Sequence, residues 1–252
     1  MSGFSPEWLA LRARADDAAR DPALLRRAAD WAGDGLIADI GGGTGATFRA
    51  LAPLAPKSRW RVLDHDAGLL ARLPADGRIE AVEADLSTSM DEIFAHRPRL
   101  VTASAFFDLA SLAWIEAFTD RLAASGAALY AVLTYDGREE WRPDPPHEAV
   151  ALAAFHRDMA RDKGLGSALG PAAHKALSVA LRARGYEVTE AQSDWRLTRG
   201  RDDAMISALA EGGASAVGDA LDPDVLKEWV AGRAAAKDVL VGHKDLFATP
   251  TA

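Results

Sequence analysis

The stretch "DGLIADIGGGTGATF" (Asp34–Phe48) decides how the rest of the chain is interpreted. A short apolar run ends next to a carboxylate, Asp39, and then meets four glycines within five residues. Glycines permit positive φ angles and let a ligand approach the backbone closely. A helix is expected directly after the loop, so several backbone N–H groups would face outward without partners. The stretch therefore predicts a strand, a ligand-binding loop and a helix.

Short apolar runs of strand length alternate with stretches of helical spacing on both sides of this loop. We expect strands at 36–40, 59–64, 79–85, 99–105 and 127–135. We expect the intervening helices to begin near Gly45, Ala67, Ser89 and Leu112. Such alternation forms parallel βαβ units with helices on both faces of one sheet. Ligands of these sheets bind at the carboxyl ends of the strands, where the glycine loop would lie.

Further helices are expected on either side of this core. Ser5-Pro6 and Asp21-Pro22 each predict a helix start within residues 5–33. The remaining segments predict a loop, a helix of about four turns and a Gly-rich link at 137–170, a helix at 171–185, a strand at 186–197, two helices at 201–237 split near Gly212-Gly213, and a last strand at 238–250.

The expected fold class is a doubly wound α/β fold with a mostly parallel seven-stranded sheet, an antiparallel last strand and helical lid insertions. We expect one domain over residues 1–252. It would comprise an N-terminal helical cap (1–35), a cofactor-binding core (36–137), a helical insert (138–170) and closing helices and strands (171–252).

The composition narrows the function classes. The chain has 252 residues, no cysteine, and 37 acidic against 29 basic residues, which gives a formal net charge of −8. The lack of cysteine excludes disulfides, zinc–thiolate sites and cysteine nucleophiles. No apolar run approaches the ~18 residues that span a membrane, and the first residues do not resemble a secretory signal. We expect a cytoplasmic protein with no metal, no membrane partner and no nucleic-acid partner, because nucleic-acid binding favours a basic face.

A glycine loop of this kind serves three classes of ligand. A triphosphate loop needs a lysine after its last glycine, but Ala46 follows Gly45. The dinucleotide fingerprint is matched by Gly41–Ala46, and an acid, Asp64, follows about 20 residues further on. S-adenosylmethionine (SAM) is the third class, and it contains no phosphate. Asp39 favours SAM, since a carboxylate beside a pyrophosphate would cost affinity, whereas it suits a cationic methionine moiety.

These features resemble the class I SAM-dependent methyltransferases, whose first motif is an apolar strand, an acid and G-x-G-x-G, as in Ile37–Gly45. The resemblance implies SAM as cofactor and S-adenosylhomocysteine (SAH) as product. It implies that Asp64 in "RVLDHD" holds the ribose hydroxyls and that Asp85 in "EADL" contacts the adenine amino group. By the same resemblance, "LVTASAFFDL" is the fourth motif. The cofactor-binding residues that it implies are Asp39, Gly41, Gly43, Gly45, Asp64, His65, Asp85, Leu86, Ala103 and Ser104.

The chain departs from the family pattern at two positions. Arg99 stands where many members have an acid at the start of the fourth strand. Asp108 stands where many small-molecule methyltransferases have a histidine, so no catalytic histidine can be transferred. Asp108 would either face the methyl acceptor or cap the helix near Leu112. His156 on the inserted helix is a second candidate base, and Trp141 is the tryptophan expected to meet substrate.

Three functions remain open at this stage. The first is methylation of a small-molecule acceptor on oxygen or nitrogen, with one of Arg12, Arg14 and Arg20 pairing with the methionine carboxylate. The second is an NAD-type oxidoreductase, which the literal glycine match favours. The third is a non-catalytic SAM- or SAH-binding protein, which the lack of a clear acid–base residue favours.

Overall fold

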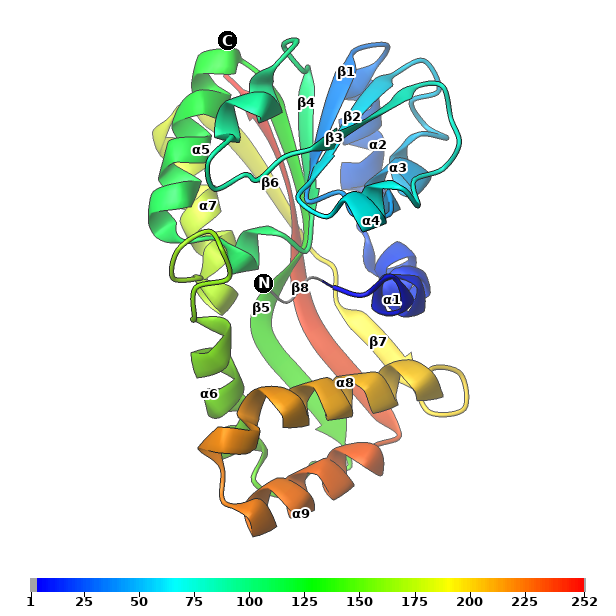
Figure 1. Ribbon diagram of the computed structural model, residues 1–252, viewed down its shortest axis with the longest axis vertical. Helices are drawn as coiled ribbons and strands as arrows, with labels where there is room; N and C mark the ends of the chain where they lie inside the picture. The colour runs from blue at the N-terminus through cyan, green and yellow to red at the C-terminus, as the bar shows by residue number, and fades with distance from the viewer. Residues whose placement is uncertain (1–3, 252) are drawn as a thin grey trace.

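One sheet organises residues 4–251, the part of the chain that this computed structural model describes (Figure 1). Eight strands occur within those residues, in the order β3-β2-β1-β4-β5-β8-β6, and β7 also pairs with β8. Their bounds are β1 (Leu36–Ile40), β2 (Arg59–Asp64), β3 (Ile79–Glu83), β4 (Leu100–Ser104), β5 (Ala128–Arg142), β6 (Tyr186–Gln192), β7 (Trp195–Thr198) and β8 (Asp238–Pro250).

The first five strands are parallel, and β8 runs antiparallel to β5, β6 and β7. The expected fold class is thereby confirmed. The strand count is one higher than expected because the predicted strand 186–197 breaks at residues 193–194 into β6 and β7.

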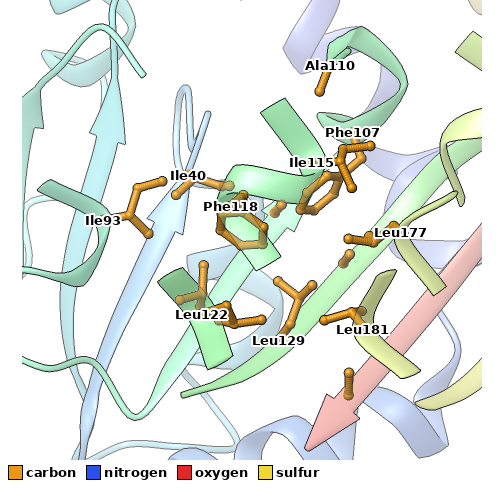
Figure 2. Packing of buried hydrophobic residues seen from close by; sticks show 14 of the residues in the cluster. Ile40, Ile93, Phe107, Ala110, Ile115, Phe118, Leu122, Leu129, Leu177 and Leu181 are labelled. Atoms are coloured by element: carbon orange, nitrogen blue, oxygen red, sulfur yellow. The ribbon is translucent and has the colours of Figure 1, made fainter. Parts of the chain in front are cut away.

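Helices cover both faces of the sheet. On one face α5 (Leu112–Ser125) and α7 (Ala173–Ala183) enclose an apolar core with β4 and β5. Figure 2 shows Phe118 and Leu122 of α5 and Leu177 of α7 converging on Leu129 of β5. On the other face lie α2 (Pro22–Ala32), α3 (Ala46–Leu51) and α4 (Ala67–Leu70). Short 3-10 helices connect these elements: η1 (Met90–Phe94), η2 (Phe107–Leu109), η3 (Gly170–Ala172) and η4 (Gly218–Ala220).

The far ends of β5 and β8 form an extension that we call the arm, made of residues 135–142, 195–198 and 238–243 (Figure 1). α6 (Glu148–Met159), α8 (Asp203–Val217) and α9 (Pro223–Ala234) pack around it, with a core of their own. The loop expected from Gly137 is therefore wrong, since β5 continues to Arg142. The sequence "GREEWR" hides this strand because its inward positions include an acid, Glu139, which is neutralised by Arg233 from α9.

Two helix predictions also need correction. The helix expected near Ser89 is the short 3-10 helix η1. The split expected near Gly212-Gly213 does not occur, because α8 continues to Val217. A Cβ atom on Gly213 would lie 3.1 Å from the Trp229 ring of α9, tighter than ordinary contact. The glycine at this position thus permits close helix packing rather than ending the helix.

The two helices expected within residues 5–33 are confirmed as α1 (Pro6–Ala19) and α2. The Ser5 hydroxyl accepts a hydrogen bond from Trp8 N at 3.2 Å, which caps α1. α1 lies beside the carboxyl ends of the central strands, next to the arm (Figure 1). Leu9 reaches the glycine loop, and Asp16 accepts a hydrogen bond from the Trp195 indole of β7. α1 therefore bridges the candidate site and the arm.

Candidate functional site

The glycine loop between β1 and α3 is held in place by hydrogen bonds from its backbone N–H groups, two to the end of β2 and one within the loop. Gly41, Gly43 and Gly45 have φ angles of 58°, 52° and 83°, which glycine adopts without strain. Gly42 N donates to Leu63 O at 3.1 Å, Gly43 N to Asp64 Oδ2 at 2.9 Å, and Gly45 N to Gly42 O at 2.8 Å. The expectation of free N–H groups is therefore wrong at three positions. The loop offers a close approach for a ligand but few donors for a phosphate.

Asp39 lies on β1 directly beneath this loop and has no solvent exposure. The Thr102 hydroxyl donates to its Oδ1 at 2.7 Å. Oδ2 has no partner among the described residues, and it lies 2.9 Å from the Cβ position of Gly42. Burial raises the pKa of Asp39 to about 6, although Thr102, Arg20 and the Thr47 hydroxyl act in the opposite direction. A buried acceptor without a donor marks a place where a ligand can supply one.

Arg20, the C-cap residue of α1, is the cation whose charge acts on the Asp39 carboxylate. Its guanidinium is buried, and Nη2 donates to the Ser104 hydroxyl at 3.1 Å. Nε and Nη1 have no partner within residues 4–251. Arg20 also acts on the pKa values of Asp39 and Asp245, both of which burial raises. One buried guanidinium thus acts on two buried carboxylates. The charge balance of this cluster therefore favours the binding of one further cation.

Three more of the expected cofactor-binding residues, Asp64, His65 and Asp85, lie at or just after the carboxyl ends of β2 and β3. Asp64 is buried, and its Oδ1 accepts from Asp66 N at 3.0 Å while Oδ2 accepts from Gly43 N. The His65 imidazole is half exposed, and its Nδ1 lies 3.4 Å from Asp64 Oδ1. Asp85 is exposed and accepts from the Ser87 hydroxyl at 2.7 Å and from its backbone N–H at 2.9 Å, and these bonds lower its pKa.

Buried backbone completes the site at β3 and β4. Leu86 is buried, and its carbonyl accepts from the Trp114 indole at 3.0 Å, which holds this turn against α5. Ala103 is buried at the end of β4, beside Ser104. The Phe106 ring lies 2.6 Å from the Cβ position of Gly41, so its edge rests on the glycine loop.

Asp108 lies in η2, after the fourth strand. Its exposed fraction is 9%, and its Oδ1 has no partner among the residues described. Burial raises the pKa of Asp108 to about 6 and outweighs the opposing charge of Arg12. The helix-capping interpretation is wrong, since Ser111 caps α5 by accepting a hydrogen bond from Trp114 N at 3.2 Å. Asp108 is therefore a buried carboxylate without a structural partner for Oδ1.

His156 on α6 belongs to a chain of polar groups on the arm. The Tyr135 hydroxyl lies 3.0 Å from His156 Nε2 and 3.3 Å from Glu139 Oε1. Burial lowers the pKa of His156 and raises that of Tyr135 well above its usual range. Trp141 does not face a substrate, because its ring is buried under the Arg233 guanidinium, 4.3 Å from the ring centre.

The structure gathers Asp39, Asp64, Asp85, Ala103, Ser104 and the glycines at one edge of the sheet. Asp108 follows β4 at this edge, and His156 belongs to the neighbouring arm. The residues that the sequence did not single out are Tyr130, Tyr135, His243 and Asp245. No short motif contains these side chains, so only the packing of β5 against β8 reveals them.

Within residues 4–251 no group of three or more His, Asp or Glu side chains is arranged to hold a metal ion. None of the helices described is both long and apolar enough to cross a bilayer.

Comparison with known proteins gives matches only at the level of structure. No protein-family model matches the chain, and no curated protein matches it either. A cyclopropane-fatty-acyl-phospholipid synthase-like protein from Lactobacillus casei shares 14% identity at a TM-score of 0.59, over 98% of this chain and 94% of that one. A putative methyltransferase from Bacillus halodurans shares 15% identity at a TM-score of 0.56, over 92% and 99%.

A third neighbour is a putative type II methyltransferase from Anaeromyxobacter dehalogenans, with 18% identity, a TM-score of 0.52 and coverage of 90% of this chain and 95% of that one. The three likenesses each cover at least 90% of this chain. With the strand order and the glycine loop described above, they confirm that this chain has the Rossmann-like fold of the class I SAM-dependent methyltransferases.

Proposed function

We propose that this protein is a SAM-dependent methyltransferase that methylates a small-molecule acceptor on oxygen or nitrogen. The observation that carries the proposal is the pair of unsatisfied buried groups at the ends of β1 and α1. Asp39 Oδ2 lacks a donor, and Arg20 Nε and Nη1 lack acceptors. The methionine part of SAM has both complements, since its ammonium donates to a carboxylate and its carboxylate accepts from a guanidinium.

The other residues at this edge suit the remaining parts of the cofactor. Asp64 would accept hydrogen bonds from the ribose hydroxyls, because each of its oxygens keeps a lone pair beyond its one backbone bond. His65, Asp85 and Leu86 would surround the adenine. The remaining residues that we assign to the cofactor line the loop and the end of β4: Gly41, Gly43, Gly45, Ala103 and Ser104.

The same geometry argues against a dinucleotide cofactor. A pyrophosphate would need outward-facing N–H groups, but Gly42 and Gly43 already donate to the end of β2 and Gly45 donates within the loop. Asp39 and Asp64 would add like-charge repulsion. SAM carries no phosphate and therefore meets neither obstacle.

When bound, SAM would supply a methyl group activated by its sulfonium. The protein must then align the acceptor, exclude water and receive a proton from the acceptor if it is a hydroxyl or an ammonium. Asp108 suits this proton transfer, because a pKa near 6 makes it a stronger base than an ordinary aspartate and leaves it ionised at neutral pH. His156, half-buried and held by Tyr135, is the second candidate base.

The surroundings of the site favour a small acceptor over a polymer. We propose that the protein acts in the cytoplasm. α1 lies over the glycine loop through Leu9, and α6 and α8 flank the arm below it. The negative net charge opposes nucleic-acid binding. The unsatisfied Asp108 Oδ1 also favours an enzyme over a non-catalytic SAM-binding protein, since a mere cofactor sensor has no need for a buried acceptor beyond the cofactor.

Titration calorimetry of the protein with SAM, SAH and NAD tests the cofactor. We expect binding of SAM and SAH, no detectable binding of NAD, and a marked loss of SAM affinity in Asp39→Asn. Tight binding of NAD, or unchanged SAM affinity in Asp39→Asn, contradicts the assignment. Gel-shift assays with tRNA and duplex DNA at low salt test the acceptor class, and a stable complex in these assays would exclude the small-molecule reading.

A further inference from the structure

Asp245 of β8 is a buried carboxylate that links the α1–α2 junction to the sheet. Its exposed fraction is 0%. Oδ2 accepts a hydrogen bond from Asp21 N at 2.8 Å, and Oδ1 accepts one from Leu133 N at 2.9 Å. The two donors lie 224 and 112 residues away along the chain. One side chain of β8 therefore holds both β5 and the start of α2.

The bond to Leu133 occurs at a β-bulge in β5. The register between β5 and β8 shifts between Ala131 and Thr134, where two residues of β5 lie opposite Asp245 alone. Leu133 adopts a φ of 54°, which is uncommon for a residue other than glycine. The Asp245 carboxylate accepts from the N–H group of this irregular backbone. The bulge and the acid thereby fix each other's position in the sheet.

The bond to Asp21 holds the backbone directly beside Arg20. The Asp21 N–H belongs to the planar peptide group that joins Arg20 to Asp21, so this hydrogen bond also restrains the Arg20 backbone. At the other end of the side chain, Arg20 Nη2 donates to the Ser104 hydroxyl at 3.1 Å. Arg20 is thus anchored at its backbone and at its tip, while Nε and Nη1 have no partner among the described residues.

The spacing between Arg20 and Asp39 matters for the methionine part of SAM. Its ammonium and its carboxylate are attached to the same carbon atom, so the groups that hold them must keep a fixed separation. Asp39 lies on β1 inside the sheet, whereas Arg20 ends a helix outside it. Burial raises the pKa of both Asp39 and Asp245, and the charge of Arg20 opposes this in each case. The bond from Asp245 to the Asp21 N–H therefore ties the arginine to the sheet that carries Asp39.

We propose that Asp245 is a positioning residue for the methionine carboxylate, because it holds Arg20 at the distance from Asp39 that SAM requires. The inference rests on the proposed function, which makes Arg20 and Asp39 the partners of the methionine part. Asp245 acts through Arg20 and does not itself contact the cofactor. A carboxylate suits this position because both of its oxygens accept hydrogen bonds. An amide would accept with one oxygen only and would turn an NH₂ group toward the other donor.

Calorimetry with SAM and with decarboxylated SAM, which lacks the methionine carboxylate, tests Asp245→Asn. We expect the preference of the parent for SAM over decarboxylated SAM to fall roughly three- to tenfold, the range of one hydrogen bond. Binding of decarboxylated SAM should stay close to that of the parent. A purely structural role would weaken the binding of both ligands alike. In an Arg20→Met background, Asp245→Asn should have no further effect on the preference, because the two residues act as one unit.

A matched pair at Asp21 tests the same bond without changing Asp245, and it serves if Asp245→Asn fails to fold. Asp21→Pro removes the N–H group that donates to Asp245, and the Asp21 φ of −68° is one that proline adopts. Asp21→Ala keeps this N–H group. Both variants lose the side chain that caps α2, so they differ in the bond to Asp245. We expect Asp21→Ala to keep the preference for SAM and Asp21→Pro to lose it.

The outcomes separate this inference from the proposed function. An equal loss for both ligands in Asp245→Asn, or the same preference in Asp21→Pro as in Asp21→Ala, overturns the positioning role while SAM binding by the parent still supports the proposed function. A parent that binds SAM and decarboxylated SAM equally well also overturns it, since Arg20 would then not hold the carboxylate. A parent that binds neither ligand contradicts the proposed function itself, and with it the role of Asp245.

Discussion

Arg20 and Ser104 are joined by a hydrogen bond of 3.1 Å that ties the end of α1 to the carboxyl end of β4. This bond uses Nη2 and leaves Nε and Nη1 directed at no described partner. The sequence offered Arg12, Arg14 and Arg20 as partners for the methionine carboxylate. The structure pairs Arg12 with Asp16 and Arg14 with Asp202, so we propose Arg20 as the partner of the methionine carboxylate.

The first prediction follows from this arrangement. Arg20→Met should weaken SAM binding by about 1.5–3 kcal/mol, the range for hydrogen bonds to charged groups. Decarboxylated SAM, which lacks the group that Arg20 would hold, should bind the parent and Arg20→Met with similar affinity. Calorimetry with both ligands provides the measurement. An equal loss for the two ligands would show that Arg20 supports the fold and does not hold the carboxylate.

The second prediction concerns the ribose. Asp64→Ala removes an acceptor placed between the glycine loop and Asp66, and SAM affinity should fall by about 1.5–3 kcal/mol. Asp120→Asn, an exposed carboxylate on α5 paired with Arg184, serves as the control and should bind SAM as the parent does. If Asp64→Ala retained the affinity of the parent, the ribose would have to lie elsewhere.

The third prediction concerns Asp108 and pH. The pKa of this carboxyl is raised in the folded protein from 3.8 to about 6, so the folded state binds more protons than the unfolded state between these values. The contribution of Asp108 to the free energy of unfolding therefore falls as pH rises through this window, by at most about 3 kcal/mol. Asp108→Asn cannot titrate, so it should be more stable than the parent above pH 6 and lose this advantage below pH 4.

Urea unfolding of parent and Asp108→Asn at several pH values measures this difference. Asp91→Asn, a substitution at an exposed carboxylate, serves as the control. Asp108→Asn should also transfer the methyl group of SAM far more slowly to any acceptor that the parent methylates, while its affinity for SAM stays unchanged. Full activity in Asp108→Asn would transfer the role of base to His156, whose own test is the loss of turnover in His156→Gln.

Much of the edge that we assign to the cofactor could be predicted from the sequence, because β1, β2 and β4 are short strands whose residues are nearly all buried between two helical layers. Acids at the ends of such strands must lie at the same edge of the sheet. Asp39 and Asp64 therefore came together as expected, next to the glycine loop. The local sequence pattern was sufficient to predict where these two acids lie, since the position of each depends only on the strand that carries it.

The strands of the arm could not be predicted from the local sequence pattern. Glu139 points inward from β5 and is tolerated there only because Arg233, 94 residues away, donates to it. A polar strand of this kind has no hydrophobic alternation to signal it. The burial of His243 was hidden for a similar reason, since the Tyr135 and Trp195 rings beside it come from β5 and β7. Long-range packing thus determines the arm, and the local sequence pattern does not predict it.

The last prediction tests the brace that holds the arm together. Arg233 is 3% exposed and donates to Glu139 at 2.6 Å and to both oxygens of Glu148, while its guanidinium lies between Trp141 and Trp229 at 4.3 and 4.4 Å. Arg233→Met would leave the Glu139 and Glu148 carboxylates without a cationic partner, with only the Tyr135 hydroxyl and the Trp141 and Trp229 indoles among the described residues still donating to them.

This loss should lower the free energy of unfolding by about 3–5 kcal/mol. Arg142→Met provides the matched control on the same arm: Arg142 is 70% exposed, and its pair with Glu140 should be worth less than about 1 kcal/mol. Urea denaturation gives both values, and hydrogen exchange should show faster opening of α9 and the far end of β5 in Arg233→Met. Similar denaturation midpoints for the two variants would mean that the aromatic packing alone holds the arm. In that case the geometry around Tyr135 and His243 would not depend on the buried ion pairs.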